Sequence, residues 1–360
     1  MRRLEHSRNI YIRNLALLRK IRRLKDKKKY QNILNNRPNP NKKTRVTKNP
    51  FSNKVENIYI DGGMDFTLLD KPESVIVVVN ALNTHKKGSL FLRNISIDLS
   101  KIETIDIGAI NFLLAKINEF SKMNRVRISG NMPANEVCRT LFLDSGFLDY
   151  MTTLSGKKFT KNSENLILSV GADKTLNEII GKTIEKSMKF LTGKEQKYPP
   201  VYSIIQEICS NSVEWAKPQS SKSKNWLLGI YLQTIDNQQY VNFALTDIGY
   251  GILHTLNRKF GTKLAEGIGN VSEPEILMRA FDRRYGSKSD EPNRNKGMPL
   301  VKDRLVRGYI CNLKVITNNV LLDFCDSSKN KVIDMNLPGT FYSWSINQKC
   351  LDTWNAKQLN

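Results

Sequence analysis

The sequence lacks several features that would place it in other classes of protein. No apolar run approaches the roughly 18 residues of a membrane-spanning helix. The N-terminus has no apolar segment followed by a small-residue cleavage site, so we expect no secretory signal peptide. The five cysteines form neither a Cys-x-x-Cys pair nor a Cys/His cluster, which argues against a disulfide framework and a zinc site. We therefore expect reduced thiols in a cytoplasmic protein.

The charge is concentrated at one end of the chain. The 360 residues carry a net charge of +23, and 40% of them are hydrophobic, which predicts folded cores. Residues 1–50 contain 17 Lys and Arg against only Glu5 and Asp26, a net charge of +15. Most of the basic charge therefore belongs to an N-terminal arm and not to the body of the protein.

The arm has a helical pattern. In MRRLEHSRNIYIRNLALLRKIRRLKDKKKYQNIL, the apolar residues Ile10, Leu17, Ile21 and Leu24 recur at helical spacing between basic residues, which predicts a basic amphipathic helix. The Asn- and Pro-rich stretch that follows, up to residue 50, predicts a linker. The arm could contact the phosphate backbone of a nucleic acid, an acidic protein or a membrane surface, or pack its apolar face on the body. The sequence leaves these alternatives open.

Strand and helix patterns alternate over residues 55–153, which predicts a small α/β domain. The β-branched runs are typical of strands and the longer segments of amphipathic helices. The predicted strands are SVIVVVNAL, SLFLRNISIDLS and RVRISG, and the predicted helices are AINFLLAKINEFSKM and ANEVCRTLFLDSGFLDYM.

This domain resembles the STAS domains of anti-sigma-factor antagonists. The resemblance rests on a strand, an Asp-led turn that opens a helix, a further strand and a helix that ends in an apolar loop. Phosphorylated STAS domains carry a serine at the acceptor position of the turn, which is Gly108 in the stretch that begins at Asp106. Thr104 and Ser100 are close by but match no acceptor position. The resemblance thus implies a docking module that is not phosphorylated at this turn.

A second group of motifs begins with IIQEICSNSVEWA at residues 204–216. Glu207 and Asn211 are four residues apart, so on a helix they lie on one face, and the flanking apolar residues predict that this helix packs on a core. Taken alone, the pair also suits a polar stripe that faces solvent.

Three further motifs follow in order along the chain. The predicted strand QYVNFALTD ends in Asp247, Gly249 and Gly251, where glycines allow a close approach of backbone to a ligand. A Gly-interrupted polar loop then leads through Gly297 into the predicted helix PLVKDRLVRG, a junction whose amides can bind phosphate. The last is Pro338-Gly339-Thr340 at the start of a predicted terminal strand.

In this order the four motifs resemble those of the GHKL ATPases, which include gyrase B, MutL, histidine kinases and anti-sigma serine kinases. The resemblance covers residues 165–347 and leaves 348–360 as a tail. It implies an α/β sandwich that binds ATP with Mg²⁺. The whole chain is then of the α/β (α+β) class, with a basic helical arm, a STAS-like domain and a GHKL ATPase domain.

The resemblance also assigns roles to residues. Asn211 would bind Mg²⁺, and Glu207 would orient and activate the attacking water or hydroxyl. General-base help of that kind contributes roughly 10²- to 10⁴-fold in rate. Asp247 would accept a hydrogen bond from the adenine amine, supported by Thr340. The remaining nucleotide contacts would come from glycines and from the lid, namely Gly249, Gly251, Gly297, Ser287 and Lys288.

Departures from the family pattern leave more than one function open. The lid reads Asn295-Lys296-Gly297, so one glycine of the usual Gly-x-Gly is lost. We expect a regulatory protein that binds ATP, hydrolyses it slowly and uses the lid to control a protein partner. The alternatives are a serine/threonine kinase that acts on another protein and a non-catalytic nucleotide-binding scaffold. The habits of the family also suggest a homodimer.

A sensor histidine kinase is excluded. Such a kinase needs a helical histidine followed by an acidic residue and a proline ahead of its ATPase domain. The three histidines, His6, His85 and His254, have no such context.

Overall fold

The computed structural model describes most of the chain from residue 55 onward. The chain divides into two units, 1–52 and 53–360, and the predicted arm and linker lie outside the described residues. The description that follows concerns the second unit. It covers residues 55–84, 92–121, 126–153, 157–159, 165–171, 177–215, 225–260, 271–282 and 297–358.

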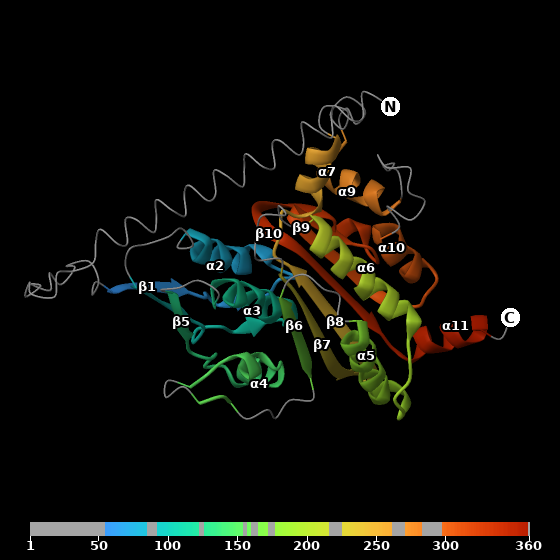
Figure 1. Ribbon diagram of the computed structural model, residues 1–360, viewed down its shortest axis with the longest axis horizontal. Helices are drawn as coiled ribbons and strands as arrows, with labels where there is room; N and C mark the ends of the chain where they lie inside the picture. The colour runs from blue at the N-terminus through green and yellow to red at the C-terminus, as the bar shows by residue number, and fades with distance from the viewer. Residues whose placement is uncertain are drawn as a thin grey trace, which may run out of the picture. The chain divides into compact units, whose positions relative to one another are not determined.

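The first sheet is parallel and has the strand order β1-β3-β5. Its strands β1 and β5 are labelled in Figure 1, beside the helices α2 and α3. The strands predicted from SLFLRNISIDLS and RVRISG are confirmed as β3 and β5, whereas β1 was not predicted. The short strands β2 and β4 form a separate parallel pair. In the chain, β2 comes before α2, and β4 comes directly before the helix α3. The strand bounds are β1 Val55–Asp61, β2 Asp65–Phe66, β3 Leu92–Asp98, β4 Thr104–Ile105 and β5 Val126–Gly130.

The prediction of a strand at SVIVVVNAL is wrong, because this segment is the helix α2 (Pro72–Thr84). Its β-branched residues favour a strand by propensity, but its buried residues follow helical spacing. Proline at the first helical position also suits a helix start. Burial of one apolar face therefore outweighs local propensity here. The buried residues are Pro72, Val75, Ile76, Val78, Val79 and Leu82.

The two other helices of this region are confirmed. Asp106 accepts a hydrogen bond from the Ala109 backbone amide at 2.6 Å and so caps α3 (Ile107–Ser121), as an Asp-led turn should. Asn135 caps α4 (Glu136–Asp144) through the amides of Val137 and Cys138. After α4 the chain turns at Gly146, whose φ of 80° suits glycine, into the short 3₁₀ helix η1 (Phe147–Tyr150).

The second sheet is antiparallel, with the strand order β6-β7-β8-β10-β9. The strands predicted at β7, β8 and β10 are confirmed, and β6 and β9 were not predicted. The predicted start of β10 at Pro338-Gly339-Thr340 is wrong, because the strand begins at Lys331. A two-residue turn with positive φ at Asp236 and Asn237 joins β7 to β8, a geometry that matches the twist of a hairpin. The bounds are β6 Leu166–Gly171, β7 Asn225–Ile235, β8 Gln238–Asp247, β9 Cys311–Asp323 and β10 Lys331–Ile346.

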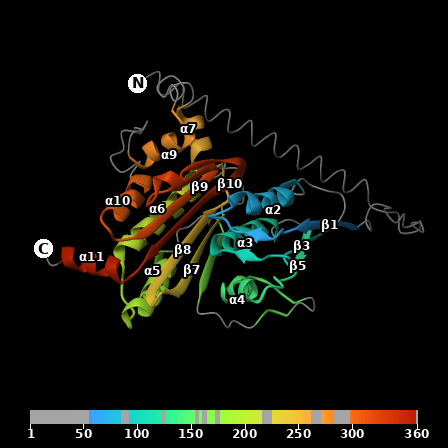
Figure 2. The same ribbon diagram turned by 180° about the vertical axis from the view of Figure 1, so that it is seen from behind.

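Helices cover one face of this sheet (Figure 2). The core between them and the sheet includes Trp226, Phe243 and Trp344. The predicted helices α5, α6 and α10 are confirmed. Residues 348–360, assigned to a tail, contain the helix α11, and α7 and α9 were likewise not predicted. The bounds are α5 Asn177–Thr192, α6 Pro199–Trp215, α7 Ile252–Phe260, α9 Glu273–Phe281, α10 Gly297–Val306 and α11 Gln348–Gln358.

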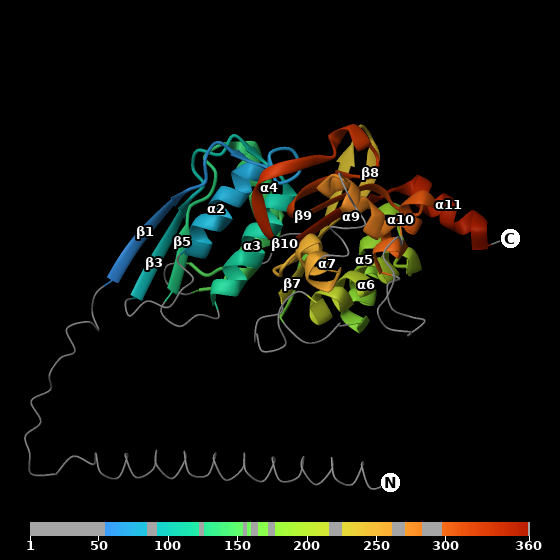
Figure 3. The same ribbon diagram turned by 90° about the horizontal axis from the view of Figure 1, so that it is seen from above.

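The other face of the second sheet is covered by α2 and α3 (Figure 3). One continuous core joins these helices to the strands, with Phe112 and Leu113 on one side and Ala244 and Phe341 on the other. The fold is therefore mixed α/β, with parallel and antiparallel sheets in one unit. Among the described residues no helix is long and apolar enough to cross a membrane.

Candidate functional site

Glu207 and Asn211 lie on α6, where the sequence predicted them on one helical face. The neighbouring apolar residues of the helix, Ile204, Ile205 and Ile208, are buried and fix its rotation. Glu207 and Asn211 are both half-buried. The helix therefore packs by its apolar face and presents the carboxylate and the carboxamide together.

The first residue of α10 lies directly on this pair. A Cβ atom added at Gly297 would be 2.5 Å from Glu207 Oε1 and 2.6 Å from Asn211 Nδ2, closer than Cβ atoms come to other atoms. A side chain at this position would therefore have to displace the ends of both Glu207 and Asn211. Two motifs some 90 residues apart in the sequence thus meet in the fold.

The end of β8 meets the same helix. The Ser212 hydroxyl donates a hydrogen bond to Asp247 Oδ2 at 3.2 Å, which ties the last residue of β8 to the position after Asn211. Across the sheet, Asp247 pairs with Trp226 on β7 and with Thr340 on β10. Cross-strand partners share a face, so all three residues point toward α6.

The loop that follows Asp247 is fixed by two residues of β9. The Thr317 hydroxyl accepts a hydrogen bond from the Ile252 amide at 2.8 Å. The Asn318 carboxamide donates to the Tyr250 carbonyl at 2.8 Å and lies so close to Gly251 that a Cβ there would overlap it. Gly251 has a φ of 81°, which favours glycine independently.

Gly339 closes the site from the side of β10. It has a φ of 124°, and a Cβ there would overlap the Asp247 carbonyl and lie 3.1 Å from the Gly249 amide nitrogen. The hydroxyl of the next residue, Thr340, is 3.1 Å from that of Thr317. Thr340 therefore supports Asp247 through cross-strand pairing, while its hydroxyl belongs to the Thr317 network.

The charges of the site affect the titration of buried neighbours. Burial raises the pKa of the Tyr342 phenol, and the Asp247 and Glu207 carboxylates raise it further. Burial also raises the pKa of the Cys209 thiol, again with a contribution from Asp247. Both groups stay protonated at neutral pH and so add no charge to the site.

The structure brings six of the predicted residues into one region and shows two that were missed. Ser287 and Lys288, the predicted lid contacts, lie outside the described residues. Thr317 and Asn318 were missed: the polar run Thr-Asn-Asn is visible in the sequence, but nothing in it points to the loop after β8. The six residues are Glu207, Asn211, Asp247, Gly251, Gly297 and Thr340, with Gly249 in the loop between them.

The donor set fits Mg²⁺ better than a transition metal. Carboxylate and carboxamide oxygens are the hard ligands that Mg²⁺ prefers, and Mg²⁺ usually takes only one or two of them together with substrate phosphates. Within the described parts of the chain, no group of three or more His, Cys, Asp or Glu residues could hold a metal ion. Asn211 alone would thus be an incomplete ligand set for Mg²⁺, which phosphate oxygens and water would have to complete.

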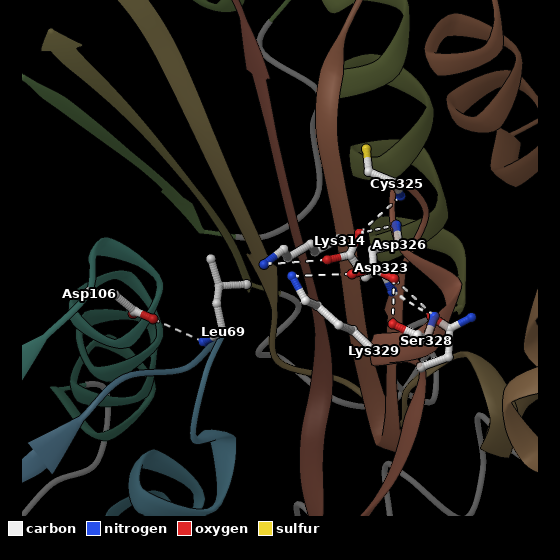
Figure 4. A network of polar contacts seen from close by, with 9 residues as sticks. Leu69, Asp106, Lys314, Asp323, Cys325, Asp326, Ser328 and Lys329 are labelled. Atoms are coloured by element: carbon white, nitrogen blue, oxygen red, sulfur yellow. Dashed lines mark hydrogen bonds and ion pairs between the residues drawn. The ribbon is translucent and has the colours of Figure 1, made fainter. Parts of the chain in front are cut away.

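Two other polar clusters have structural roles (Figure 4). Asp106 Oδ2 accepts hydrogen bonds from the amides of Leu68 and Leu69, which ties the segment before α2 to the start of α3. Burial nevertheless raises the pKa of the Asp106 carboxyl. Asp323 Oδ1 accepts from the Cys325 and Asp326 amides and so shapes the turn after β9.

Comparisons with known proteins assign no family. No protein-family model matches the chain, and a search of curated proteins finds no match. The functional argument therefore rests on the geometry of the site and on the motifs that compose it.

Proposed function

We propose that the protein binds ATP with Mg²⁺ between α6, the end of β8 and the start of α10, hydrolyses it slowly and acts as a regulator. The observation that carries this proposal is the position of Gly297 against both Glu207 and Asn211. A polar stripe that faced solvent would have no backbone packed on it. A helix N-terminus beside a carboxylate–carboxamide pair is a place where phosphate oxygens and a hard cation can be held together.

The roles of the residues follow from where their polar atoms lie. Asp247, at the end of β8 and tied to Ser212, would accept a hydrogen bond from the adenine amine. The backbone amides at the start of α10 would bind phosphate oxygens, since they have no partners within the helix. Gly251 and Gly339 keep the backbone around Asp247 free of side chains.

The reaction would be the attack of water on the terminal phosphorus of ATP, which breaks the bond to the bridging oxygen and releases ADP and phosphate. Bound Mg²⁺, with Asn211 as its protein ligand, would neutralise charge that develops on the phosphate oxygens. Glu207, one turn earlier on α6, would orient the water and take up its proton. The lid lacks one of the two glycines of the GHKL pattern, which is consistent with slow turnover.

The fold gives this reading further support. An antiparallel five-stranded sheet with α5 and α6 on one face is the arrangement that the GHKL resemblance implies. The STAS-like region packs on the opposite face, and Gly108, at the position of the phosphate acceptor, is covered by Phe341. A change in conformation at the nucleotide site would thus alter the packing of the STAS-like region on the sheet. That change would in turn alter the binding of a protein partner.

The test is ATP turnover by the full chain with Mg²⁺, measured as released phosphate. We expect slow turnover by the wild type and at least about a 100-fold loss for Glu207→Gln, since a general base contributes that much or more. Asn211→Ala should lose Mg²⁺-dependent binding of ATP. Gln206→Ala is the matched control on the same helix, because Gln206 contacts the Tyr202 hydroxyl instead of the site.

Two results would overturn the proposal. One is a wild-type protein that binds no ATP at millimolar concentration. The other is turnover that survives in Glu207→Gln at the level of Gln206→Ala, because the activity would then come from elsewhere. If the wild type binds ATP but never hydrolyses it, the protein is a nucleotide-binding scaffold and not an ATPase.

A further inference from the structure

The two strands that carry the candidate site also carry an interface on their other face. On β8 and β10, Asp247 pairs with Thr340, and the adjacent register pair is Thr246 with Phe341. Successive residues of a strand point to opposite faces. Asp247 and Thr340 therefore face α6, while Thr246 and Phe341 face α3.

The first turns of α3 contact both residues of the interface pair. Gly108 lies under Phe341, where an added Cβ would be 2.8 Å from the ring carbon Cζ. One turn later, Asn111 Nδ2 donates hydrogen bonds to Thr246 Oγ1 at 3.3 Å and to the Ala244 carbonyl at 2.8 Å. Positions 108 and 111 are three apart and so share a helix face.

Asn111 is an unusual choice for this interface. It is fully buried, as are Thr246 and Phe341, and apolar residues surround it. Its carboxamide oxygen has no hydrogen-bond partner among the described residues. A buried polar group that is only partly satisfied adds little to stability, so its value here lies in a directed contact with one strand.

We propose that Asn111 is a positioning residue for the nucleotide site and acts on Asp247 through β8. The two hydrogen bonds hold β8 at residues 244 and 246, directly before the carboxylate that would read the adenine amine. Ser212 holds that carboxylate from the opposite face. This inference rests on the proposed function and adds that the STAS-like region contributes to recognition of the base.

The inference predicts a change in base selectivity that a general loss of structure would not produce. Purine riboside triphosphate differs from ATP by the absence of the 6-amino group, so the ratio of the two affinities reports the Asp247 contact. For the wild type we expect ATP to bind at least about tenfold more tightly, the usual value of one hydrogen bond to a carboxylate. Displacement of Asp247 removes that preference.

The experiment is calorimetric titration of both nucleotides, with Mg²⁺, into the full chain. Asn111→Leu keeps the number and branching of the side-chain heavy atoms and removes the nitrogen that makes both hydrogen bonds, and Thr246→Val removes one acceptor. For Asn111→Leu we expect a preference for ATP below about threefold with little change in affinity for the analogue, and for Thr246→Val a smaller change in the same direction. Tyr231→Phe is the control, since Tyr231 is buried against the same core but pairs with Asn242, away from Asp247.

Each outcome decides the matter. A preference that stays at the wild-type level in both variants overturns the inference, as does an equal loss of affinity for both nucleotides, which would be a structural effect. If Asn111→Leu does not fold, Thr246→Val alone decides. A wild type that binds ATP without any preference overturns the inference and leaves nucleotide binding intact. A wild type that binds neither nucleotide overturns the proposed function itself.

Discussion

Gly108 lies so close to Phe341 that no side chain fits between them. An added Cβ would be 2.8 Å from Cζ of the ring, 3.3 Å from Asp106 Oδ1 and 3.4 Å from Leu68 Cβ. In the STAS resemblance drawn from the sequence, this position corresponds to the acceptor serine. In the structure the same position is a packing contact between α3 and β10.

Introducing a hydroxyl group at position 108 should therefore destabilise the fold instead of creating a phosphate acceptor. For Gly108→Ser we expect the free energy of unfolding to fall by about 1–3 kcal/mol, the usual cost of overpacking a core. Denaturant unfolding measures it. In the double variant Gly108→Ser with Phe341→Leu, the smaller side chain should recover part of the loss, and strict additivity of the two changes would contradict the contact.

Gly297 should be intolerant of any side chain for a reason connected with activity. In Gly297→Ala the methyl group would displace the Glu207 carboxylate or the Asn211 carboxamide, so we expect at least about a tenfold fall in ATP turnover. Gly181→Ala is the control. Gly181 lies within α5, and its Cβ would meet only Tyr202 Cε2 of α6, at 3.8 Å. Alanine at this position should stabilise α5 by about 0.5–1 kcal/mol. Equal turnover in the two variants would place Gly297 outside the site.

Thr317 supports the loop after β8 and is fully buried. Thr317→Val would leave the Ile252 amide without the hydroxyl that it donates to at 2.8 Å. An unpaired buried donor costs about 1–3 kcal/mol, and we expect a loss of that size in thermal or denaturant unfolding. Thr317→Ser keeps the hydroxyl and should retain most of the stability. If the valine variant is as stable as the serine variant, the hydrogen bond does not support the loop.

The lowered pKa of Asp98 predicts that the stability of the fold falls in acid. Hydrogen bonds from the Ser100 amide and hydroxyl and from the Asn131 carboxamide lower the pKa of the Asp98 carboxyl from 3.8 to about 2. Because the folded-state pKa is depressed, the carboxylate stabilises the fold above about pH 4, and this contribution is lost as the pH falls toward 2.

The variant Asp98→Asn tests this sensitivity. It should unfold with a shallower dependence on pH in this window, measured by denaturant unfolding at successive pH values. Asp334→Asn, which removes an exposed carboxylate, is the control for net charge. Identical slopes for the two variants would contradict the assignment.

Local patterns in the sequence were sufficient where one element carries the signal. Glu207 and Asn211 could be placed on one helix face from their spacing, and the strand that ends in Asp247 is followed by Gly251, whose φ of 81° favours glycine. The SVIVVVNAL segment shows the limit of propensity. Its valines and isoleucine favour a strand, but the spacing of its buried residues is helical, and tertiary burial decided the outcome.

The rest of the site depends on contacts between distant segments. Thr317 and Asn318 reach the loop after β8 from a strand some 65 residues later, which no local pattern reveals. The packing of α3 on the second sheet is likewise a tertiary property. Asn111 in AINFLLAKI looks like a solvent-facing position of an amphipathic helix, and only the fold shows it fully buried against β8.

The most direct test of the account is equilibrium binding of Mg-ATP to the wild type and to Asp247→Asn. We expect the wild type to bind, and the variant to lose at least about tenfold in affinity, because the amide removes the charged acceptor for the adenine amine while keeping its shape. Ser212→Ala should cause a smaller loss in the same direction. Absence of binding by the wild type, or equal affinity of the wild type and Asp247→Asn, would contradict the account.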